Sequence, residues 1–281
     1  MIEFKQPGQF TTIQDLGRYG YRAMGVPVSG PMDRASASFA NQLLGNDLTD
    51  SIIEMSLTGA TLYFHKSAII TITGADCKVT VDSEIIELNR VVKIEANSTL
   101  KCGQISSGNY LYLAILGGII SKNILGSACY YGGLTEKSRI EKGQKLHFNN
   151  EIQTYKSHGA VVKRAPKEQD EFIQVEKGPE FHQLSVSDIQ RLTESFFSVS
   201  RQSNRMGLRL ENQVSIDIKE IISSPVQPGT VQLTSGGQLI VLMRDAQTTG
   251  GYSRVFQLTP SGINILAQKP FDEPFKFQLV D

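Results

Sequence analysis

Short segments in which hydrophobic and polar residues alternate, or in which apolar residues run together, recur along almost the whole chain. Alternation with a period of two is typical of a half-buried strand, and a short apolar run between turn residues is typical of a fully buried one. The chain is therefore predicted to be mainly β. The predicted strands are residues 68–73, 78–81, 91–95, 110–116, 172–175, 214–218, 239–243, 263–267 and 275–280.

Helical periodicity is rarer. The clearest helix follows Ser29-Gly30-Pro31, where Pro31 suits the first helical position and Asp33 in the first turn faces the positive end of the helix dipole. Gly45 stands just past the end of this helix. The residues predicted to form its buried face are Met32, Ala35, Phe39 and Leu43.

A second helix is predicted to begin near Ser187, with Gln190 as a capping partner. Its buried stripe would be Ile189, Leu192 and Phe196. Many strands with a few short helices favour a barrel architecture.

The chain of 281 residues is long enough for two domains or for one large β-rich domain. Residues 155–171 are polar and mixed in charge, which is typical of a domain boundary or an exposed connection. We place the boundary near residue 165, which predicts domains of residues 1–165 and 166–281.

Charge and hydropathy exclude several classes of partner. The 28 basic and 28 acidic residues balance, so no global field favours nucleic acid or anionic lipid. The start of the chain lacks the pattern of a secretory signal, and the longest apolar segment, residues 110–120, is shorter than the roughly 20 residues that span a bilayer. We therefore expect a cytoplasmic protein that binds small molecules or other proteins.

The cysteines and histidines give no sign of a disulfide framework or a metal site. Three widely separated cysteines are predicted to be reduced and mostly buried, and the histidines show none of the spacings that place two imidazoles on one metal. The residues concerned are Cys77, Cys102, Cys129, His65, His147, His158 and His182.

A polar segment, Asp245-Ala246-Gln247-Thr248-Thr249-Gly250-Gly251-Tyr252, directly follows the apolar run 239–243. It gathers a carboxylate, an amide, two hydroxyls and a phenol around two glycines, which let the backbone turn sharply or approach a ligand. The segment predicts a polar small-molecule site, with a tight turn that satisfies its own backbone as the alternative.

The early segment from Gly8 to Gly30 is also long and polar, as loops that line a site often are. Asp15 and Arg18 within it either pair with each other or face a ligand. The helix that follows Ser29 offers backbone donors to an anion at its start.

Other charged groups need partners or ligands. Glu54 lies in an apolar setting, so we expect a cationic or hydrogen-bonding partner for it. Arg205 and Arg209 either clamp a carboxylate or phosphate, or form ordinary surface ion pairs. The sequence contains no phosphate-binding loop, dinucleotide fingerprint, nucleophile elbow or zinc-protease motif.

Taken together, six blocks of the sequence resemble one family. The blocks are residues 11–18 (TTIQDLGR), 25–33 (GVPVSGPMD), 40–46 (ANQLLGN), 125–127 (LGS), 204–210 (NRMGLRL) and 245–252 (DAQTTGGY). In this order they resemble the PxpC/KipA family, the C-type subunits of bacterial 5-oxoprolinase, which are similar to allophanate hydrolase subunit 2 and to the carboxyltransferase part of urea amidolyase. The resemblance spans nearly the whole chain.

The resemblance implies a fold of two cyclophilin-like β-barrel halves. It implies a protein that works with a KipI-like (B-type) and a LamB/YcsF-like (A-type) partner to hydrolyse 5-oxo-L-proline to L-glutamate with ATP. ATP and Mg²⁺ would be held by the complex, in a member that the sequence does not identify.

We expect this chain to supply one wall of a composite site in which the early and late polar segments meet. The residues predicted to be catalytic are Asp15, Asp245 and Gln247. The residues predicted to bind substrate or phosphate are Gln14, Arg18, Ser29, Asp33, Arg205, Thr248, Thr249 and Tyr252. In this scheme the arginines take a carboxylate or phosphate, and Asp245 with Gln247 handles the lactam nitrogen or an ordered water.

The chain departs from the family pattern in three loops. It has Leu134 to Ser138 where a Gly-Arg pair commonly follows the double glycine, Gln232 to Gly236 where prolines are usual, and Ser253 where a proline often follows the tyrosine. The shapes of these loops therefore do not transfer from the family.

Two other functions remain open at this point. The first is a biotin-dependent carboxyltransferase of the urea amidolyase or allophanate type; the chain has no Met-Lys-Met biotin attachment site, so the carrier would be another chain. The second is a regulator without catalysis that binds a KipI-like inhibitor of a sensor kinase.

Overall fold

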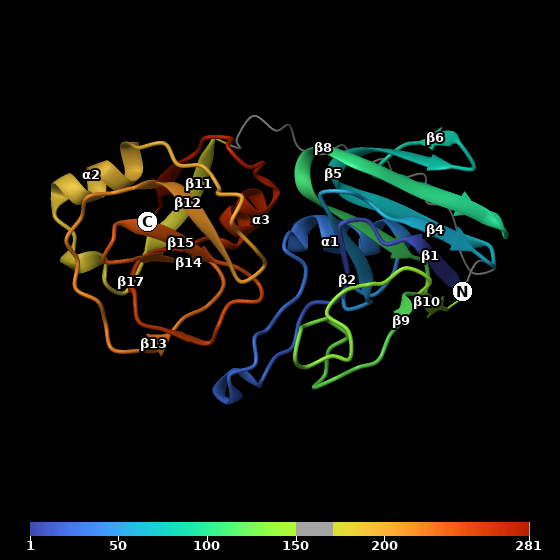
Figure 1. Ribbon diagram of the computed structural model, residues 1–281, viewed down its shortest axis with the longest axis horizontal. Coiled ribbons are helices and arrows are strands. Elements are labelled where there is room, and N and C mark those ends of the chain that lie inside the picture. The colour runs from blue at the N-terminus through green and yellow to red at the C-terminus, as the bar shows by residue number, and fades with distance from the viewer. Residues whose placement is uncertain (150–170, 281) are drawn as a thin grey trace. The chain divides into compact units, whose positions relative to one another are not determined.

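The structure is a computed structural model that describes residues 1–149 and 171–280 (Figure 1). The chain divides into two compact units, each with its own sheet and core. Unit 1 comprises Met1–Arg18 and Ser29–Arg164, and unit 2 comprises Tyr19–Val28 and Ala165–Asp281. The fold is mainly β and consists of two curled half-barrel sheets, as predicted.

The sequence gives no sign that Tyr19–Val28 belongs to unit 2. Within this segment the short helix η1 (Arg22–Met24) is joined to unit 2 by a hydrogen bond from Arg22 Nη2 to the carbonyl of Val226. The predicted boundary near residue 165 lies outside the described residues and stays a prediction.

The ten described strands of unit 1 form one antiparallel sheet. Its main path runs β2-β3-β8-β4-β1-β10-β9, while β5 pairs with β6, β7 and β8. The strands are β1 (Ile2–Gln6), β2 (Phe10–Gln14), β3 (Ile52–Ser56), β4 (Thr61–Phe64), β5 (Ala68–Val81), β6 (Glu84–Ile86), β7 (Val91–Ile94), β8 (Ser98–Ile115), β9 (Ile119–Ile120) and β10 (Lys145–Phe148).

The long strands β5 and β8 bury both of their faces where they pair. On β8, Leu111, Leu113 and Ile115 belong to the main core, while the alternate residues Tyr112 and Ala114 belong to a second cluster. That second cluster is closed by helix α1 (Arg34–Leu44), which lies against β5 and β8 (Figure 1). Because strand side chains alternate, one strand contributes to both layers.

Helix α1 begins later than predicted. Asp33 is its N-cap, since the Asp33 carboxylate accepts a hydrogen bond from Ser36 N–H at 3.1 Å, and Gly45 closes the helix in the left-handed conformation as predicted. Of the predicted buried face only Met32 is fully buried; Ala35 is exposed and Phe39 and Leu43 are half-buried, so most of that face was wrong. The side chains that α1 buries are Ala37, Ala40, Asn41 and Leu44.

Two predicted strands of unit 1 proved to be one. Residues 68–73 and 78–81 both lie in β5, which continues through Gly74 with shifts in its pairing to β8. The segment 110–116 is the end of a much longer β8 that begins at Ser98. Polar residues in the middle of β8 hide this continuity from the hydropathy pattern.

Unit 2 contains a six-stranded sheet in the order β12-β15-β14-β17-β11-β18, together with the short pair β13 and β16. The neighbours in the main sheet are antiparallel except for β11 and β18, which are parallel. The strands are β11 (Phe172–Lys177), β12 (Gly207–Gln213), β13 (Ser224–Pro225), β14 (Thr230–Leu233), β15 (Gln238–Leu242), β16 (Thr249–Gly250), β17 (Ser253–Leu258) and β18 (Lys276–Leu279).

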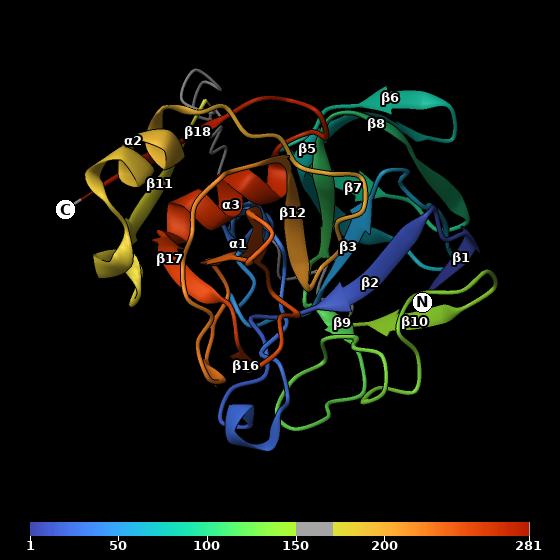
Figure 2. The ribbon, with the colours of Figure 1, turned by 60° about the vertical axis from the view of Figure 1, so that its left-hand side comes forward.

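Aromatic side chains fill much of the core of unit 2. Phe197, Phe256, Phe275 and Phe277 are fully buried, and Phe277 has ring centroids 5.4–5.6 Å from the other three. Such contacts favour tilted and edge-on packing, which fixes the positions of β17 and β18. Helix α3 (Pro260–Gln268) runs alongside β11 and β17 (Figure 2).

Two strand predictions in unit 2 were wrong. Residues 263–267 are part of helix α3, which begins after the N-cap Thr259 with Pro260 in its first turn. Residues 214–218 form no strand; Val214, Ile216 and Ile218 are buried alternately, but the segment lacks a regular ladder.

The second predicted helix is α2 (Val186–Glu194). Its N-cap is Ser185, which forms a capping box with Asp188, so the predicted capping partner Gln190 was wrong. Leu192 is buried as predicted, whereas Phe196 lies beyond the helix and is exposed. A short helix, η4 (Phe181–Gln183), precedes α2.

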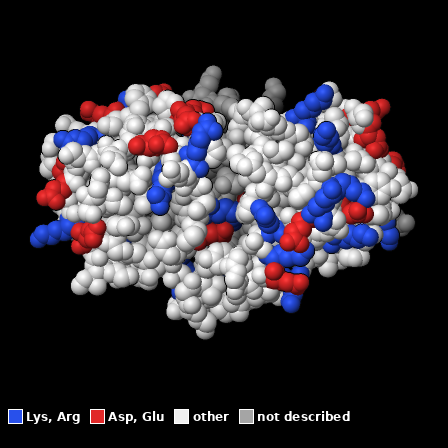
Figure 3. Space-filling model, viewed as in Figure 1, with Lys and Arg blue, Asp and Glu red and all other residues white. Residues whose placement is uncertain are grey.

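Charged side chains are mixed on the face of the molecule shown in Figure 3, where Lys and Arg lie among Asp and Glu. This agrees with the zero net charge. In the described chain no helix has the length and apolar character needed to cross a membrane.

Candidate functional site

In unit 1, strand β2 delivers Gln14 to a buried position beside the loop that precedes α1. The Gln14 Oε1 atom accepts a hydrogen bond from Gly30 N–H at 3.2 Å, and Gln14 Nε2 donates to Thr12 Oγ1 at 3.0 Å. A Cβ added at Gly30 would lie 3.2 Å from the carbonyl oxygen of Asp15. The segments 14–18 and 29–34 therefore pack directly together, as the sequence predicts for residues of one site.

Asp15 is occupied by donors from a distant loop. Its carboxylate accepts hydrogen bonds from Gly17 N–H at 2.8 Å, Ser127 Oγ at 2.7 Å and Ala128 N–H at 2.6 Å, and the Cys129 thiol lies 3.0 Å from Oδ1. These contacts hold residues 127–129 against the end of β2. A catalytic role for Asp15 stays a prediction, because its oxygens already serve this loop.

Arg18 does not pair with Asp15 in the described part of the chain, so the ion-pair alternative was wrong. Its side chain is fully buried, Nε donates to the carbonyl of Ile124 at 3.0 Å, and Nη2 donates to the carbonyl of Cys129 at 2.9 Å. The Nη1 atom is also buried and has no hydrogen-bond partner among the described residues. A guanidinium held only by carbonyl dipoles keeps its full charge inside the unit.

The start of α1 is neutralised by the chain's own carboxylates. Asp33 caps the helix, and Glu54 on β3 accepts a hydrogen bond from Met32 N–H at 2.7 Å. The Tyr112 hydroxyl accepts from Asp33 N–H at 2.8 Å. This corrects the prediction that an external anion occupies the helix start, and it supplies the hydrogen-bonding partner expected for Glu54.

Tyr112 stays protonated between these acids. Burial, followed by the charges of Glu54 and Asp33, raises the pKa of Tyr112 well above its usual range. Tyr112 pairs with Glu54 across β8 and β3, so both polar side chains point to the same face of the sheet. The group buttresses the loop that holds Ser29.

Cys129 behaves as a structural thiol. Burial and the nearby Asp15 carboxylate raise the pKa of Cys129 to about 12, so the thiolate required of a nucleophile is disfavoured. All three cysteines are free, as predicted.

In unit 2, Arg205 and Asp245 form a two-pronged ion pair. Arg205 Nε lies 2.7 Å from Asp245 Oδ2, and Nη2 lies 3.2 Å from Oδ1; both residues are buried. The Asp245 amide also donates to the carbonyl of Arg205 at 2.9 Å. The pair fixes the start of the polar segment that follows β15. Arg209 is exposed on β12 and does not share this environment.

The rest of the late segment is braced by its backbone. The amide of Val226 donates to the carbonyl of Thr248 at 3.1 Å, β13 pairs with β16, and the amide of Ile221 donates to the carbonyl of Gly251 at 3.0 Å. The segment is thus a turn whose backbone is satisfied by neighbouring loops.

The side chains of this turn are available to a ligand. Gln247, Thr249 and Tyr252 are exposed and Thr248 is half-buried. In the part of the chain that the structure describes, none of these four side chains makes a hydrogen bond or ion pair. The turn alternative and the site prediction are therefore compatible, since the backbone forms a turn while the side chains remain unused.

Ser253 shows why a departure from the family pattern is tolerated. Its hydroxyl donates to the carbonyl of Lys219, a bond that a proline at this position could not make. The residue begins β17 directly after the exposed Tyr252.

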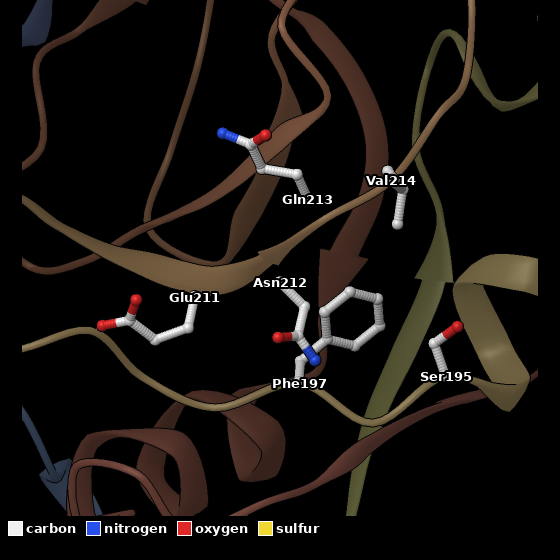
Figure 4. Close-up of a pocket in the computed structure, with 6 residues that line it drawn as sticks. All are labelled: Ser195, Phe197, Glu211, Asn212, Gln213 and Val214. Carbon is white, nitrogen blue, oxygen red and sulfur yellow. The ribbon is translucent and has the colours of Figure 1, made fainter.

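Unit 2 also carries a pocket of about 430 Å³ on strand β12 and the segment before it (Figure 4). It is lined by Ser195, Phe197, Glu211, Asn212, Gln213 and Val214. None of the predicted site residues lines it. In Figure 4 the Phe197 ring and the Asn212 amide lie at its centre, and Glu211 lies to one side.

Several residues that build these sites escape the sequence prediction. Ser127, Cys129 and Tyr112 lie far along the chain from the residues they hold, and only Ser127 falls in a block that carries the family resemblance. Within residues 1–149 and 171–280, no three His, Cys, Asp or Glu side chains gather in a way that could hold a metal ion.

A family model described as carboxyltransferase domain, subdomain A and B, matches residues 24–279. The chain belongs to this carboxyltransferase family. The C-type 5-oxoprolinase subunit of Escherichia coli (strain K12) is 31% identical over 291 residues, which cover 99% of this chain and 90% of that protein. The urea amidolyase of Saccharomyces cerevisiae is 44% identical over 127 residues, which are 45% of this chain and 7% of that protein.

The crystal structure of the K. lactis urea amidolyase contains the same fold, with a TM-score of 0.88 and 24% identity. The alignment covers 100% of this chain and 19% of that one, so the present chain spans about a fifth of the larger enzyme. Within the carboxyltransferase family, the early and late polar segments described above belong to the matched region from residue 24 onward only in part, since Gln14, Asp15 and Arg18 precede it. That the two segments line one cleft stays a prediction.

Proposed function

We propose that the chain is the C-type member of an ATP-dependent 5-oxoprolinase, which hydrolyses 5-oxo-L-proline to L-glutamate together with a LamB/YcsF-like (A-type) and a KipI-like (B-type) partner. The supporting observation is the extent of the match. A C-type 5-oxoprolinase subunit from Escherichia coli aligns from end to end, over 99% of this chain and 90% of its own length. The match to urea amidolyase covers less than half of this chain and a small part of a much larger protein.

The reaction sets the chemical demands on the site. Opening an unstrained lactam is slow, and phosphorylation of the lactam oxygen by ATP would convert it into a leaving group that departs as phosphate after water attacks the ring carbon. The site must hold the substrate carboxylate, contact the lactam nitrogen and oxygen, and neutralise charge as it develops. The described carboxylates Asp15 and Asp245 are already engaged, so we assign ATP and Mg²⁺ to the assembled complex.

The late segment supplies the contacts that this chemistry needs. The Gln247 amide can donate to the lactam oxygen or accept from the lactam N–H, and the Thr249 hydroxyl and Tyr252 phenol can do the same. All three are exposed and unused within the described chain. Asp245 and Arg205 position this segment through their ion pair, and we propose that they act through it on the lactam nitrogen or an ordered water.

Carboxyl transfer from biotin is the second candidate. It is favoured by the family model itself and by the higher identity, 44%, of the shorter match to urea amidolyase. Under this proposal the carboxybiotin would arrive on a separate carrier chain. A third candidate, a regulator that binds a KipI-like protein, involves no turnover.

A mixture of this chain with a LamB/YcsF-like protein and a KipI-like protein tests the proposal. ADP release that requires 5-oxoproline supports the oxoprolinase. Consumption of carboxybiotin on addition of urea, without a response to 5-oxoproline, would replace it with the carboxyltransferase. Tight binding to the KipI-like protein with neither activity would leave the regulator.

A further inference from the structure

Two buried polar groups of unit 1 lack partners within the described chain, and both lie at the predicted site. One is Nη1 of Arg18, and the other is Oγ of Ser29; both residues are completely buried. Buried polar atoms in folded proteins are almost always hydrogen-bonded, so each exception requires an explanation. Two exceptions on segments in direct contact are more informative than either alone.

The contact between the segments is close. Gly30, next to Ser29, donates to Gln14, and a Cβ at Gly30 would lie 3.2 Å from the carbonyl of Asp15 and 3.3 Å from that of Leu16. Arg18 follows this stretch by two residues and is anchored through its other two nitrogens. The anchors leave Nη1, with its two N–H groups, as the remaining donor of the guanidinium.

The charge of Arg18 lacks a counter-ion within the described chain. The nearest acid in sequence, Asp15, makes no ion pair with Arg18 and instead accepts donors from Gly17, Ser127 and Ala128. An uncompensated buried charge is strongly unfavourable, which makes an anion from outside the unit the natural partner. Arginine is well suited to such a partner because its planar fork matches carboxylate and phosphate oxygens.

Ser29 is held in a strained conformation with its hydroxyl unused. Its φ of 61° lies in the left-handed region that non-glycine residues seldom adopt. Such strain is frequent at ligand sites, where the surrounding structure enforces it. The neighbouring glycines Gly25 and Gly30 also have positive φ values, 80° and 99°, so the loop can bend on either side of Ser29 to admit a ligand.

We propose that Arg18 Nη1 and Ser29 Oγ form a subsite for a small oxyanion, in which the guanidinium and the hydroxyl each donate to an oxygen of a carboxylate or phosphate. Only the identity of the anion rests on the proposed function: the carboxylate of 5-oxoproline or the phosphate released from ATP. The loop that contains Ser29 moves to admit the anion, because both donor atoms are covered in the structure.

The test measures thermal unfolding of the full chain with sodium phosphate, sodium 5-oxoprolinate or sodium chloride at matched ionic strength. A saturable rise in Tm with phosphate or 5-oxoprolinate, absent with chloride, is expected, and the active anion identifies the source. Ser29→Gly removes the hydroxyl and accepts the positive φ, and Arg18→Met removes the charge; each is expected to weaken anion binding at least tenfold. Ser127→Ala is the matched control, because the Ser127 hydroxyl already serves Asp15.

Equal anion binding by the wild-type chain and the Ser29→Gly and Arg18→Met variants, or no saturable binding at all, would overturn the subsite and indicate that internal water satisfies both atoms. Should Arg18→Met fail to fold, Ser29→Gly decides alone. The outcome is separate from that of the proposed function, since anion binding by the isolated chain can persist when the mixture of all three proteins does not turn over 5-oxoproline.

Discussion

Arg205 and Asp245, forty positions apart in the sequence, bind each other through two charge-assisted hydrogen bonds of 2.7 Å and 3.2 Å. The side chains are only 9% and 10% exposed. The pair lies at the point where β15 gives way to the polar segment of unit 2. It therefore fixes the position of Gln247, two residues beyond Asp245, without using any of the exposed side chains.

Breaking this pair on one side is expected to destabilise the protein strongly. Asp245→Ala leaves Arg205 buried without its counter-charge, at a cost of about 3 kcal/mol in the free energy of unfolding. The double variant Arg205→Met/Asp245→Leu removes both charges and is expected to recover most of that loss. Urea denaturation of the four proteins measures the coupling; additive effects of the two substitutions would show that the ion pair is unimportant.

Gln247 is expected to matter for turnover and not for stability. Gln247→Ala removes an exposed amide without a partner in the described chain, so the free energy of unfolding should change by less than about 0.5 kcal/mol. Loss of a donor to the developing charge should lower kcat by about 100-fold. Gln190→Ala, on the exposed face of α2, is the matched control. Wild-type kcat in Gln247→Ala would remove this residue from the site.

Glu180 gives unit 2 a pH dependence of known sign. Three hydrogen bonds from Arg254, at 2.8–2.9 Å, hold the pKa of Glu180 below its usual value of 4.5. A lowered pKa in the folded state means that the ion pair stabilises the fold above the usual carboxyl range, and that this contribution disappears as the pH falls through the folded value. Glu180→Gln is expected to cost about 2 kcal/mol at pH 7.

The difference between wild type and Glu180→Gln should shrink steadily below about pH 4.5, as measured by urea denaturation across the range. A difference that stays constant from pH 7 to pH 3 would contradict the assignment. Glu176→Gln, on an exposed position of β11, controls for the loss of one negative charge.

Tyr112→Phe tests the buttress beneath the Ser29 loop. The substitution leaves Asp33 N–H and the buried Glu54 without the phenol, which should cost about 2 kcal/mol in the free energy of unfolding. Tyr63→Phe is the matched control, because the Tyr63 phenol makes an exposed hydrogen bond to Asn97. Equal stability of the two variants would show that the buried group contributes nothing beyond packing.

The elements that the sequence predicts well are those whose hydrophobic pattern matches their burial. Residues 239–243 and 275–280 coincide with β15 and β18 to within a residue or two because one or both faces of these strands are in the core. Residues 263–267 mislead, since Ile263 and Ile265 alternate like a strand. The helical signal lay just upstream, in the Thr259-Pro260 pair that caps α3.

The candidate site is predictable in its members but not in its wiring. Gln14, Asp15, Arg18 and Ser29 do lie on segments in contact, and Gln247, Thr249 and Tyr252 are exposed together on one turn. The partners of Asp15 lie 112 and 113 residues away, and no local pattern encodes such a contact. Local rules therefore identify polar loops, while the roles of Asp15, Asp33 and Asp245 depend on tertiary partners.

The most direct test of the proposed function is an omission measurement. The LamB/YcsF-like and KipI-like proteins are incubated with ATP and 5-oxoproline, with and without this chain, and the glutamate formed is quantified. We predict that glutamate forms only when the chain is present, in proportion to the ADP released, and that Gln247→Ala lowers the rate about 100-fold. Glutamate formed at the same rate without the chain would contradict the proposed function.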